Sequence, residues 1–222
     1  MPLLQANNLT ISQVHELLGF VRQSAGTFVP LLQLQPLTEF EQQELNQIQS
    51  DFERYLTSGK VSEELVKALT TYPLLRLAGF YRYPIKLSIE HDIAEIVIAD
   101  ADCYITGKLD ILAFDCASDQ TPHIFFWLLV IESKNSAVAP SAGLPQLLTY
   151  AHQSLETQPA TWGLITNGEL YQFVYIRKQS QPTYQLMPIL SLLEPEPSMQ
   201  LLQVLKAIRQ IAMRSDSVEF SR

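Results

Sequence analysis

The sequence predicts a single α/β domain in which a mixed β-sheet is flanked by helices and preceded by an N-terminal helical extension. Three observations lead to this prediction. Hydrophobic residues make up 47% of the chain and charged residues 17%, which is enough apolar material for a sizeable core. The apolar period is helical over the first sixty residues and becomes extended from about Ile85. The unbroken apolar run at 124–131 is typical of a buried strand.

Two helices are predicted before residue 60, which makes 1–60 the helical extension and 61–222 the main domain of one compact unit. The first follows Ser12, a candidate N-cap, and carries apolar residues at helical spacing: Val14, Leu17, Leu18 and Val21. The second begins at Thr38, which forms a capping box with Glu41, and ends at Gly59. Its predicted buried face comprises Leu45, Ile48, Phe52, Tyr55 and Leu56.

A third helix is predicted after Ser62, with a buried face of Leu65, Ala68 and Leu69, and it is broken near Pro73. The strands predicted next are Ile85–Ser88, Ile93–Ile98, Gly107–Phe114 and Ile124–Glu132. A crossover helix over 144–155 opens with Pro145 at the favoured first position. The last elements are strands at 162–166 and 170–176, joined by the tight turn Asn167-Gly168, and a helix at 198–213.

Charge and motif content exclude several classes of function. A net charge of −8 argues against a strong, self-sufficient DNA binder, because such proteins usually present a basic face. The four histidines are scattered, and the zinc, ATP-binding, dinucleotide-binding and GxSxG patterns are missing. The two cysteines, Cys103 and Cys116, are too few for a disulfide-stabilised secreted protein, and no leader or membrane span is recognisable. We therefore expect a cytoplasmic protein with reduced thiols and no membrane partner.

Two carboxylates and a lysine are the candidate chemical centre. Asp110 lies in a strand that is apolar on both faces, with Leu109, Ile111 and Ala113 expected on one side and Leu112 and Phe114 on the other. A buried carboxylate there is costly unless a metal, a cation or a hydrogen-bond network meets it. The following strand ends in Glu132, Ser133 and Lys134, and side chains two apart on a strand share a face. Pairing of the two strands would bring Asp110, Glu132 and Lys134 into one cluster.

Such a cluster can hold a divalent ion. Two carboxylates and a backbone carbonyl, for which Ser133 is the candidate, suit Mg²⁺ or Mn²⁺, which prefer oxygen ligands. A bound metal polarises a phosphodiester and lowers the pKa of a bound water, while an ammonium beside it offsets developing negative charge. The alternative is a structural ion pair between Glu132 and Lys134 at the end of a strand, because an acidic-x-Lys tripeptide is expected about once by chance in a chain of this length.

Four sequence blocks, GKLDIL (107–112), VIESK (130–134), LPQLLTYAHQS (144–154) and WGLITNG (162–168), resemble the PD-(D/E)XK nuclease superfamily. They most resemble the N-terminal nuclease domain of type I restriction enzyme R subunits, in a stand-alone form, over 62–193. The resemblance implies a restriction-endonuclease-like fold, metal ligands at Asp110 and Glu132, and a catalytic lysine at Lys134. It also implies a QxxxY motif at Gln146 and Tyr150, which contacts DNA or braces the site.

The resemblance further implies a glutamate on the helix before the sheet. Alignment permits Glu63, but a helical wheel places Glu64 closer to the predicted buried face, so Glu64 is preferred as the fourth catalytic residue. The chain departs from the family at Leu109, where a proline is usual, and the 222 residues contain no helicase. The second departure removes the motor that a restriction R subunit uses.

Three functional hypotheses follow. The first is a Mg²⁺- or Mn²⁺-dependent endonuclease that hydrolyses phosphodiester bonds in nucleic acid, with DNA as the expected partner, within a restriction or defence system. The second is a non-catalytic module that retains the nuclease fold and binds a protein or nucleic-acid partner, which the acidic charge favours. A helical assembly protein is the third, and it depends on the N-terminal helices alone. A partner subunit that supplies DNA affinity and a homo-oligomer both remain open.

Overall fold

The computed structural model describes residues 3–92, 95–98, 103–116 and 126–219. The strands are β1 (Leu3–Gln5), β2 (Val21–Arg22), β3 (Ile85–Asp92), β4 (Ile96–Ile98), β5 (Cys103–Thr106), β6 (Lys108–Asp115), β7 (Phe126–Ser133), β8 (Ala160–Thr166), β9 (Leu170–Arg177) and β10 (Thr183–Ser191). The helices are η1 (Ala6–Asn8), α1 (Ile11–Leu18), α2 (Glu39–Leu56), α3 (Glu63–Val66), α4 (Tyr72–Leu77), η4 (Pro140–Gly143), α5 (Leu144–Ser154) and α6 (Pro195–Glu219). A π-helical turn, η2 (Lys67–Thr71), joins α3 to α4.

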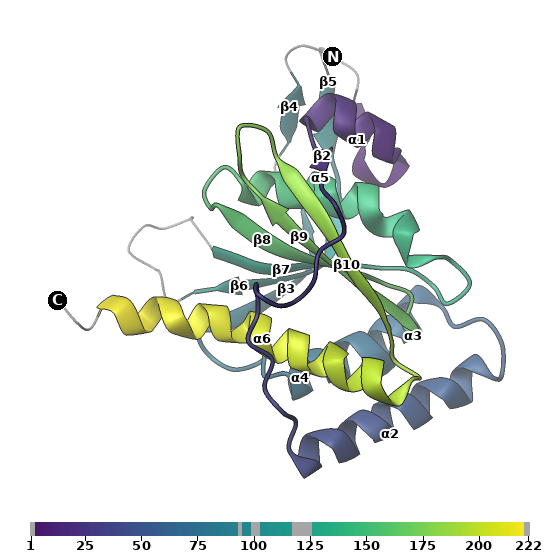
Figure 1. The fold of residues 1–222 in the computed structure, drawn as a ribbon. Helices are drawn as coiled ribbons and strands as arrows, with labels where there is room; N and C mark the ends of the chain where they lie inside the picture. The colour runs from purple at the N-terminus through teal and green to yellow at the C-terminus, as the bar shows by residue number, and fades with distance from the viewer. Residues whose placement is uncertain (1–2, 93–94, 99–102, 117–125, 220–222) are drawn as a thin grey trace.

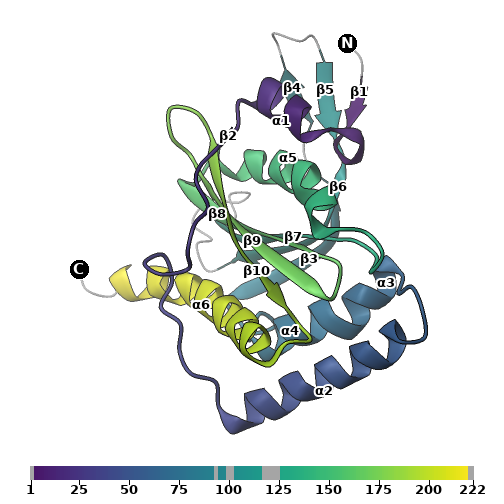
Figure 2. The ribbon, with the colours of Figure 1, turned by 45° about the vertical axis from the view of Figure 1, so that its right-hand side comes forward.

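A seven-stranded mixed sheet in the order β2-β10-β9-β8-β7-β6-β3 separates two helical layers. Helices α1 and α5 lie on one face, and α2, α3, α4 and α6 lie on the other, with α2 outermost (Figures 1 and 2). A three-stranded sheet, β1-β5-β4, stands beyond α1 and α5 at the top of Figure 1. This arrangement confirms the predicted α/β class with a mixed sheet flanked by helices. Among the described helices, none is both long and apolar enough to cross a membrane.

The layers enclose two cores, one on each face of the sheet. The core on the α5 face includes Val14 of α1 and Leu147 of α5. The core on the other face includes Phe52 of α2, Leu74 of α4 and Leu205 of α6. Because the central strands contribute buried residues to both cores, β6, β7 and β8 are apolar on both faces, as their sequences predict.

Strand pairing sets up the end of the sheet where the candidate residues lie. Strands β6 and β7 are antiparallel neighbours, with Ile111 opposite Ile131. Strands β7 and β8 are parallel, so the connection between them must cross over, and α5 makes that crossover. The strands of Asp110 and Glu132 are therefore adjacent, as predicted.

Two predictions about the strands were wrong. Strand β4 pairs with β5 in the small sheet, although the sequence suggested that 93–98 joins the main one. Residues 93–94 and 124–125 of the predicted strands lie outside the described residues. Strand β10 was missed because Pro188 lies within it, where the register with β9 shifts between Leu186 and Ile189. Proline is tolerated in a strand at such an irregularity, because it cannot donate to the ladder.

The first sixty residues are less helical than predicted. Helix α1 is capped by Thr10, whose capping box uses Gln13, so Ser12 is not the cap. It ends at Gly19, whose φ of 70° requires the left-handed region that glycine adopts without strain. Val21 lies in β2, paired with Thr183 of β10, and β1 pairs with β5. Helix α2 and its predicted capping box at Thr38 are confirmed. The boundary at residue 60 stays a prediction.

The helix after Ser62 exposes two of the three residues that were predicted to be buried, and the third, Leu69, is half-buried against the core. Leu65 is 40% exposed and Ala68 is exposed, and the buried residues are instead Val66, Lys67, Thr70 and Thr71. The π-helical turn carries the chain past Pro73 into α4, so the proline does not break the helix. A π-turn changes which residues face inward, and here it places a lysine and two threonines against the sheet. Tyr55 of α2, also expected inside, is 39% exposed.

Candidate active site

Glu132, near the end of β7, is the most deeply buried charged residue of the cluster. It is 1% exposed and packs against Gly143, where an added Cβ would lie 2.9 Å from the Glu132 Cγ. The Lys134 ammonium donates to its Oε1 at 2.5 Å. Its Oε2 is buried and has no hydrogen-bond partner among the described residues. An unpaired buried carboxylate oxygen is costly, so this atom is the one that a proton or a bound cation would satisfy.

The pKa of Glu132 reflects this environment. Burial, and next the negative charge of Asp110, raise it from 4.5 to about 8, although Lys134 acts in the opposite direction. Desolvation and a like charge both disfavour the ionised carboxylate. At neutral pH the group therefore holds a proton unless another positive charge reaches it.

Asp110 of β6 has partners for both carboxylate oxygens. Its Oδ2 accepts the backbone N–H of Ser133 at 2.7 Å, and its Oδ1 accepts from the Lys67 ammonium at 3.2 Å. The pairing between β3 and β6 is irregular at Asp110. Glu90, opposite Asp110, has a φ of 50°, and the β3–β6 register skips this pair. Leu109 packs in the same core as Leu112, so the predicted alternation around Asp110 is also interrupted.

Lys67 is a residue of the charged cluster that the sequence did not predict. It is 8% exposed, and its ammonium lies 3.2 Å from Asp110 and 3.5 Å from Glu63. Burial by itself lowers the pKa of Lys67, but Asp110 and Glu63 outweigh that effect, so the pKa lies above its usual value. The available signal was the spacing of Glu63 and Lys67, since residues four apart are neighbours on a helix.

The helix glutamate is a correction to the sequence-based preference. Glu63 pairs with Lys67, and its charge contributes to the raised pKa of Glu132. Glu64 is exposed and bonds only locally, to Ser62 and its own backbone. The helical wheel misled because the true buried face contains Lys67 and Thr70 rather than Leu65 and Ala68. The structure thus places Glu63, not Glu64, beside the cluster.

Two residues of helix α5 support Lys134 through hydrogen bonds. Gln146 accepts from the Lys134 ammonium at 3.3 Å and donates to the Tyr150 hydroxyl at 2.8 Å. That hydroxyl donates to the backbone carbonyl of Lys108 at 2.6 Å. Burial, followed by the charge of Glu132, raises the pKa of Tyr150, so the group remains a neutral donor. Gln146 and Tyr150 thus support Lys134 from inside the protein, and Tyr150 is only 1% exposed.

The donor set fits a hard divalent ion with few protein ligands. Within the described ranges, no group of three His, Cys, Asp or Glu side chains is arranged to hold a metal. Mg²⁺ usually needs only one or two carboxylates, because it keeps several of its waters. Asp110 and Glu132 supply two carboxylates on adjacent strands, and the Glu132 Oε2 has its lone pairs free. The residues present are therefore compatible with such an ion.

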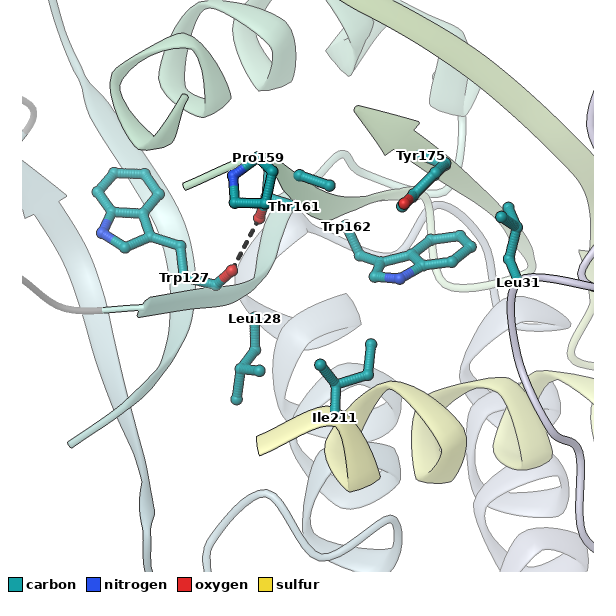
Figure 3. A pocket seen from close by; sticks show the side chains of 9 residues that line it. Leu31, Trp127, Leu128, Pro159, Thr161, Trp162, Tyr175 and Ile211 are labelled. Carbon is teal, nitrogen blue, oxygen red and sulfur yellow. Dashed lines mark hydrogen bonds between the residues drawn. The ribbon is translucent and has the colours of Figure 1, made fainter. Parts of the chain in front are cut away.

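A pocket lies at the opposite end of β7, around Trp127 (Figure 3). It is an apolar pocket of about 150 Å³ lined by Trp127, Trp162, Tyr175 and Ile211 among others. One of its polar groups is already paired, since the Thr161 hydroxyl donates to the Trp127 carbonyl at 3.0 Å. The pocket is smaller than typical ligand sites, which start at about 300 Å³, and no acidic, basic or histidine side chain of the described residues lines it. In the part of the chain that the structure describes, this pocket therefore offers no carboxylate or imidazole for acid–base or metal chemistry.

No protein-family model matches the chain, and no curated protein matches it either. Solved structures that are similar include a fragment assigned to an HsdR subunit of a type I restriction enzyme from Vibrio vulnificus YJ016. The two share 16% sequence identity with a TM-score of 0.38, over 62% of this chain and 24% of that chain. A similarity of this size says nothing about activity, so function depends on the geometry of the cluster.

Proposed function

We propose that this protein is a Mg²⁺- or Mn²⁺-dependent nuclease of the PD-(D/E)XK type that hydrolyses phosphodiester bonds in nucleic acid. The observation that carries the proposal is the Glu132 Oε2, a buried carboxylate oxygen without a partner among the described residues, in a carboxylate whose other oxygen pairs with Lys134 and whose pKa the charge of Asp110 raises. A fully structural ion pair has no need of an unsatisfied oxygen. Strongly perturbed carboxylates next to a specific charge partner are typical of catalytic sites.

In this proposal Asp110, Glu132 and the Ser133 carbonyl hold the ion. The ion would polarise the phosphodiester and lower the pKa of a water that attacks it. Lys134 stabilises the negative charge that develops on the phosphate oxygens, since its ammonium is held at the site by Glu132 and Gln146. Tyr150 fixes the orientation of the Gln146 amide, because it is itself anchored on the Lys108 carbonyl. Preorganisation of this kind is what makes a cation effective in the transition state.

DNA is the proposed substrate, within a restriction or defence system. The net charge of −8 means that phosphate binding by this chain alone is weak, because counterion release needs many lysines and arginines. We therefore expect a partner subunit to contribute DNA affinity. Cleavage by the isolated chain should need low salt and should fall steeply between 50 and about 200 mM salt.

The test combines cleavage with metal binding. Single- and double-stranded DNA and RNA are incubated at low salt with Mg²⁺ or Mn²⁺, and calorimetric titration measures binding of the metal alone. Wild-type protein should bind the ion and cut at least one substrate, and Asp110→Ala should lose both properties. Asp51→Ala, which changes a half-exposed aspartate on α2, is the matched control and should keep both. Equal metal binding by wild type and Asp110→Ala would remove the site from this position.

One observation favours a non-catalytic binding module instead. Both carboxylates proposed as metal ligands already have a cation partner, since Asp110 pairs with Lys67 and Glu132 pairs with Lys134. A module of this kind would bind no divalent ion, cut no substrate, and lose stability in both the Asp110→Ala and Lys134→Met variants. The titration and the melting temperatures together distinguish the two functions.

A further inference from the structure

Lys67 brings a second ammonium to the cluster. It is not one of the metal ligands proposed above. Its ammonium is 3.2 Å from Asp110 Oδ1 and 3.5 Å from Glu63 Oε1. The residue is 8% exposed, so its ammonium has lost most of its contact with water and interacts with two carboxylates instead. A buried ammonium between two carboxylates provides one of the two cations that phosphodiester hydrolysis often employs.

The cluster therefore offers two positions for a cation. One lies between Asp110 and Glu63 and is filled by the Lys67 ammonium. The other lies beside the Glu132 Oε2, which is buried and unpartnered among the described residues. The two positions share Asp110, whose Oδ1 faces Lys67 while its Oδ2 is fixed by the Ser133 N–H.

The backbone holds Lys67 in this position. It is the first residue of the π-helical turn, and its buried neighbours on the same segment are Val66, Thr70 and Thr71. Thr70 is tied to the helix by a bond from its hydroxyl to the Val66 carbonyl at 2.8 Å. Because the side chain of Lys67 is buried, moving its ammonium into solvent would be costly. The ammonium is therefore a fixed part of the site.

We propose that Lys67 is a built-in second cation, so that the protein takes one divalent ion and not two. The proposal rests on the metal-dependent function stated above, and it specifies which positive charges that site contains. Its consequence is that a neutral side chain at position 67 frees Asp110 Oδ1 and the Glu63 carboxylate for a second ion. Lys67 is then a positioning residue for Asp110, and its ammonium does the work that a second metal does in a two-metal site.

The experiment counts ions bound by the intact chain during calorimetric titration with Mn²⁺ alone. Wild-type protein should bind one ion per chain and Lys67→Met should bind two. The second ion should disappear in the double variant Lys67→Met/Glu63→Gln and persist in Lys67→Met/Glu64→Gln, because Glu64 is exposed. Lys206→Met is the matched control, since Lys206 also forms a part-buried ion pair, with Glu41, far from the cluster, and it should bind one ion.

Melting temperatures in EDTA establish that each variant is folded. If Lys67→Met does not fold, Lys67→Gln takes its place, because its amide is polar enough for a part-buried position and carries no charge. Two ions in the wild-type protein, or one ion in the folded neutral variant, would overturn this inference and leave the metal site itself intact. No binding by wild-type protein would overturn the proposed function and this inference with it.

Discussion

Strand β7 has buried polar groups at both ends, and the two ends satisfy them differently. At its start the Gln158 amide accepts from the Trp127 N–H at 2.7 Å and donates to the carbonyls of Trp127 and Ala160. The Thr161 hydroxyl adds a bond to the same Trp127 carbonyl. At its end, Glu132 has one oxygen on Lys134 and the other without a partner among the described residues.

We attribute the satisfied end of β7 to the stability of the fold and the unsatisfied end to the proposed reaction. A fully satisfied buried network contributes stability, because every group that left water has found a replacement bond. A buried carboxyl with a free oxygen and a pKa of about 8 reduces stability at neutral pH, and such a group persists where a ligand completes it. We therefore expect changes at the two ends of β7 to affect different measurements.

The largest expected effect concerns Glu132 and pH. Its folded-state pKa is raised from 4.5 to about 8, so its contribution to stability is complete below pH 4.5 and is lost as pH rises towards 8. At about 1.4 kcal/mol per pKa unit the loss amounts to roughly 5 kcal/mol. Urea denaturation in EDTA should show that Glu132→Gln gains stability relative to wild type as pH rises over this range.

The exposed residue Glu53 provides the control for this prediction, because Glu53→Gln should follow the wild-type pH profile. A constant difference between Glu132→Gln and wild type from pH 5 to 8 would contradict the raised pKa of Glu132.

The second prediction concerns Lys134. Loss of its ammonium should reduce cleavage by about 10²-fold or more in Lys134→Met, because charge stabilisation in the transition state is removed. The melting temperature should fall by only a few degrees, since Glu132 can take up a proton at neutral pH. Cleavage assays and thermal melts of Lys134→Met and Lys206→Met, run together, separate catalysis from ion-pair stability. A strongly destabilised variant of a protein that cuts no substrate would identify a structural salt bridge.

The third prediction tests the satisfied end. Gln158→Ala leaves the buried Trp127 N–H without its acceptor, which should lower the free energy of unfolding by about 2 kcal/mol. Exposed Gln179 serves as the control, and Gln179→Ala should change stability by less than about 0.5 kcal/mol. Below the melting transition, Gln158→Ala should bind Mn²⁺ as wild type does. Loss of metal binding without loss of stability would show that this end of β7 also serves the site.

The smallest expected effect is steric. Gly143 has helical backbone angles that alanine adopts easily, but the added methyl would approach the Glu132 Cγ to 2.9 Å. Overpacking of this kind should cost about 1 kcal/mol and displace the carboxyl group. Calorimetry should show weaker Mn²⁺ binding in Gly143→Ala than in Ser141→Ala, a change at an exposed position of the same turn. Unchanged binding would mean that the position of Glu132 is not critical.

Much of the central fold could be predicted from the sequence because its signals are local. The apolar runs of β6 to β9, the proline at the start of α5 and the turn at Asn167-Gly168 each specify their own element. Asp110 and Glu132 were expected to be neighbours because consecutive strands usually pair. Lys134 was expected beside Glu132 because side chains alternate along a strand. The catalytic roles of these residues remain predictions.

The elements that escaped prediction depend on distant partners. Strands β1 and β2 are three and two residues long and form against β5 and β10, which lie far along the chain. Lys67 was missed, and Glu64 was preferred to Glu63, because the π-helical turn changes the buried face of the helix. A helical wheel assumes a regular repeat and cannot anticipate such a turn.

The pairing of β2 with β10 has a consequence for how the chain folds. It joins Val21 to Thr183, so a large loop must close before this contact can form. The strands and the helix that carry Asp110, Glu132 and Gln146 are close together in sequence, and local contacts form first when loop closure limits the rate. Hydrogen exchange during refolding should therefore protect β6, β7 and β8 before β2, so the cluster is assembled before the N-terminal segment closes the edge of the sheet.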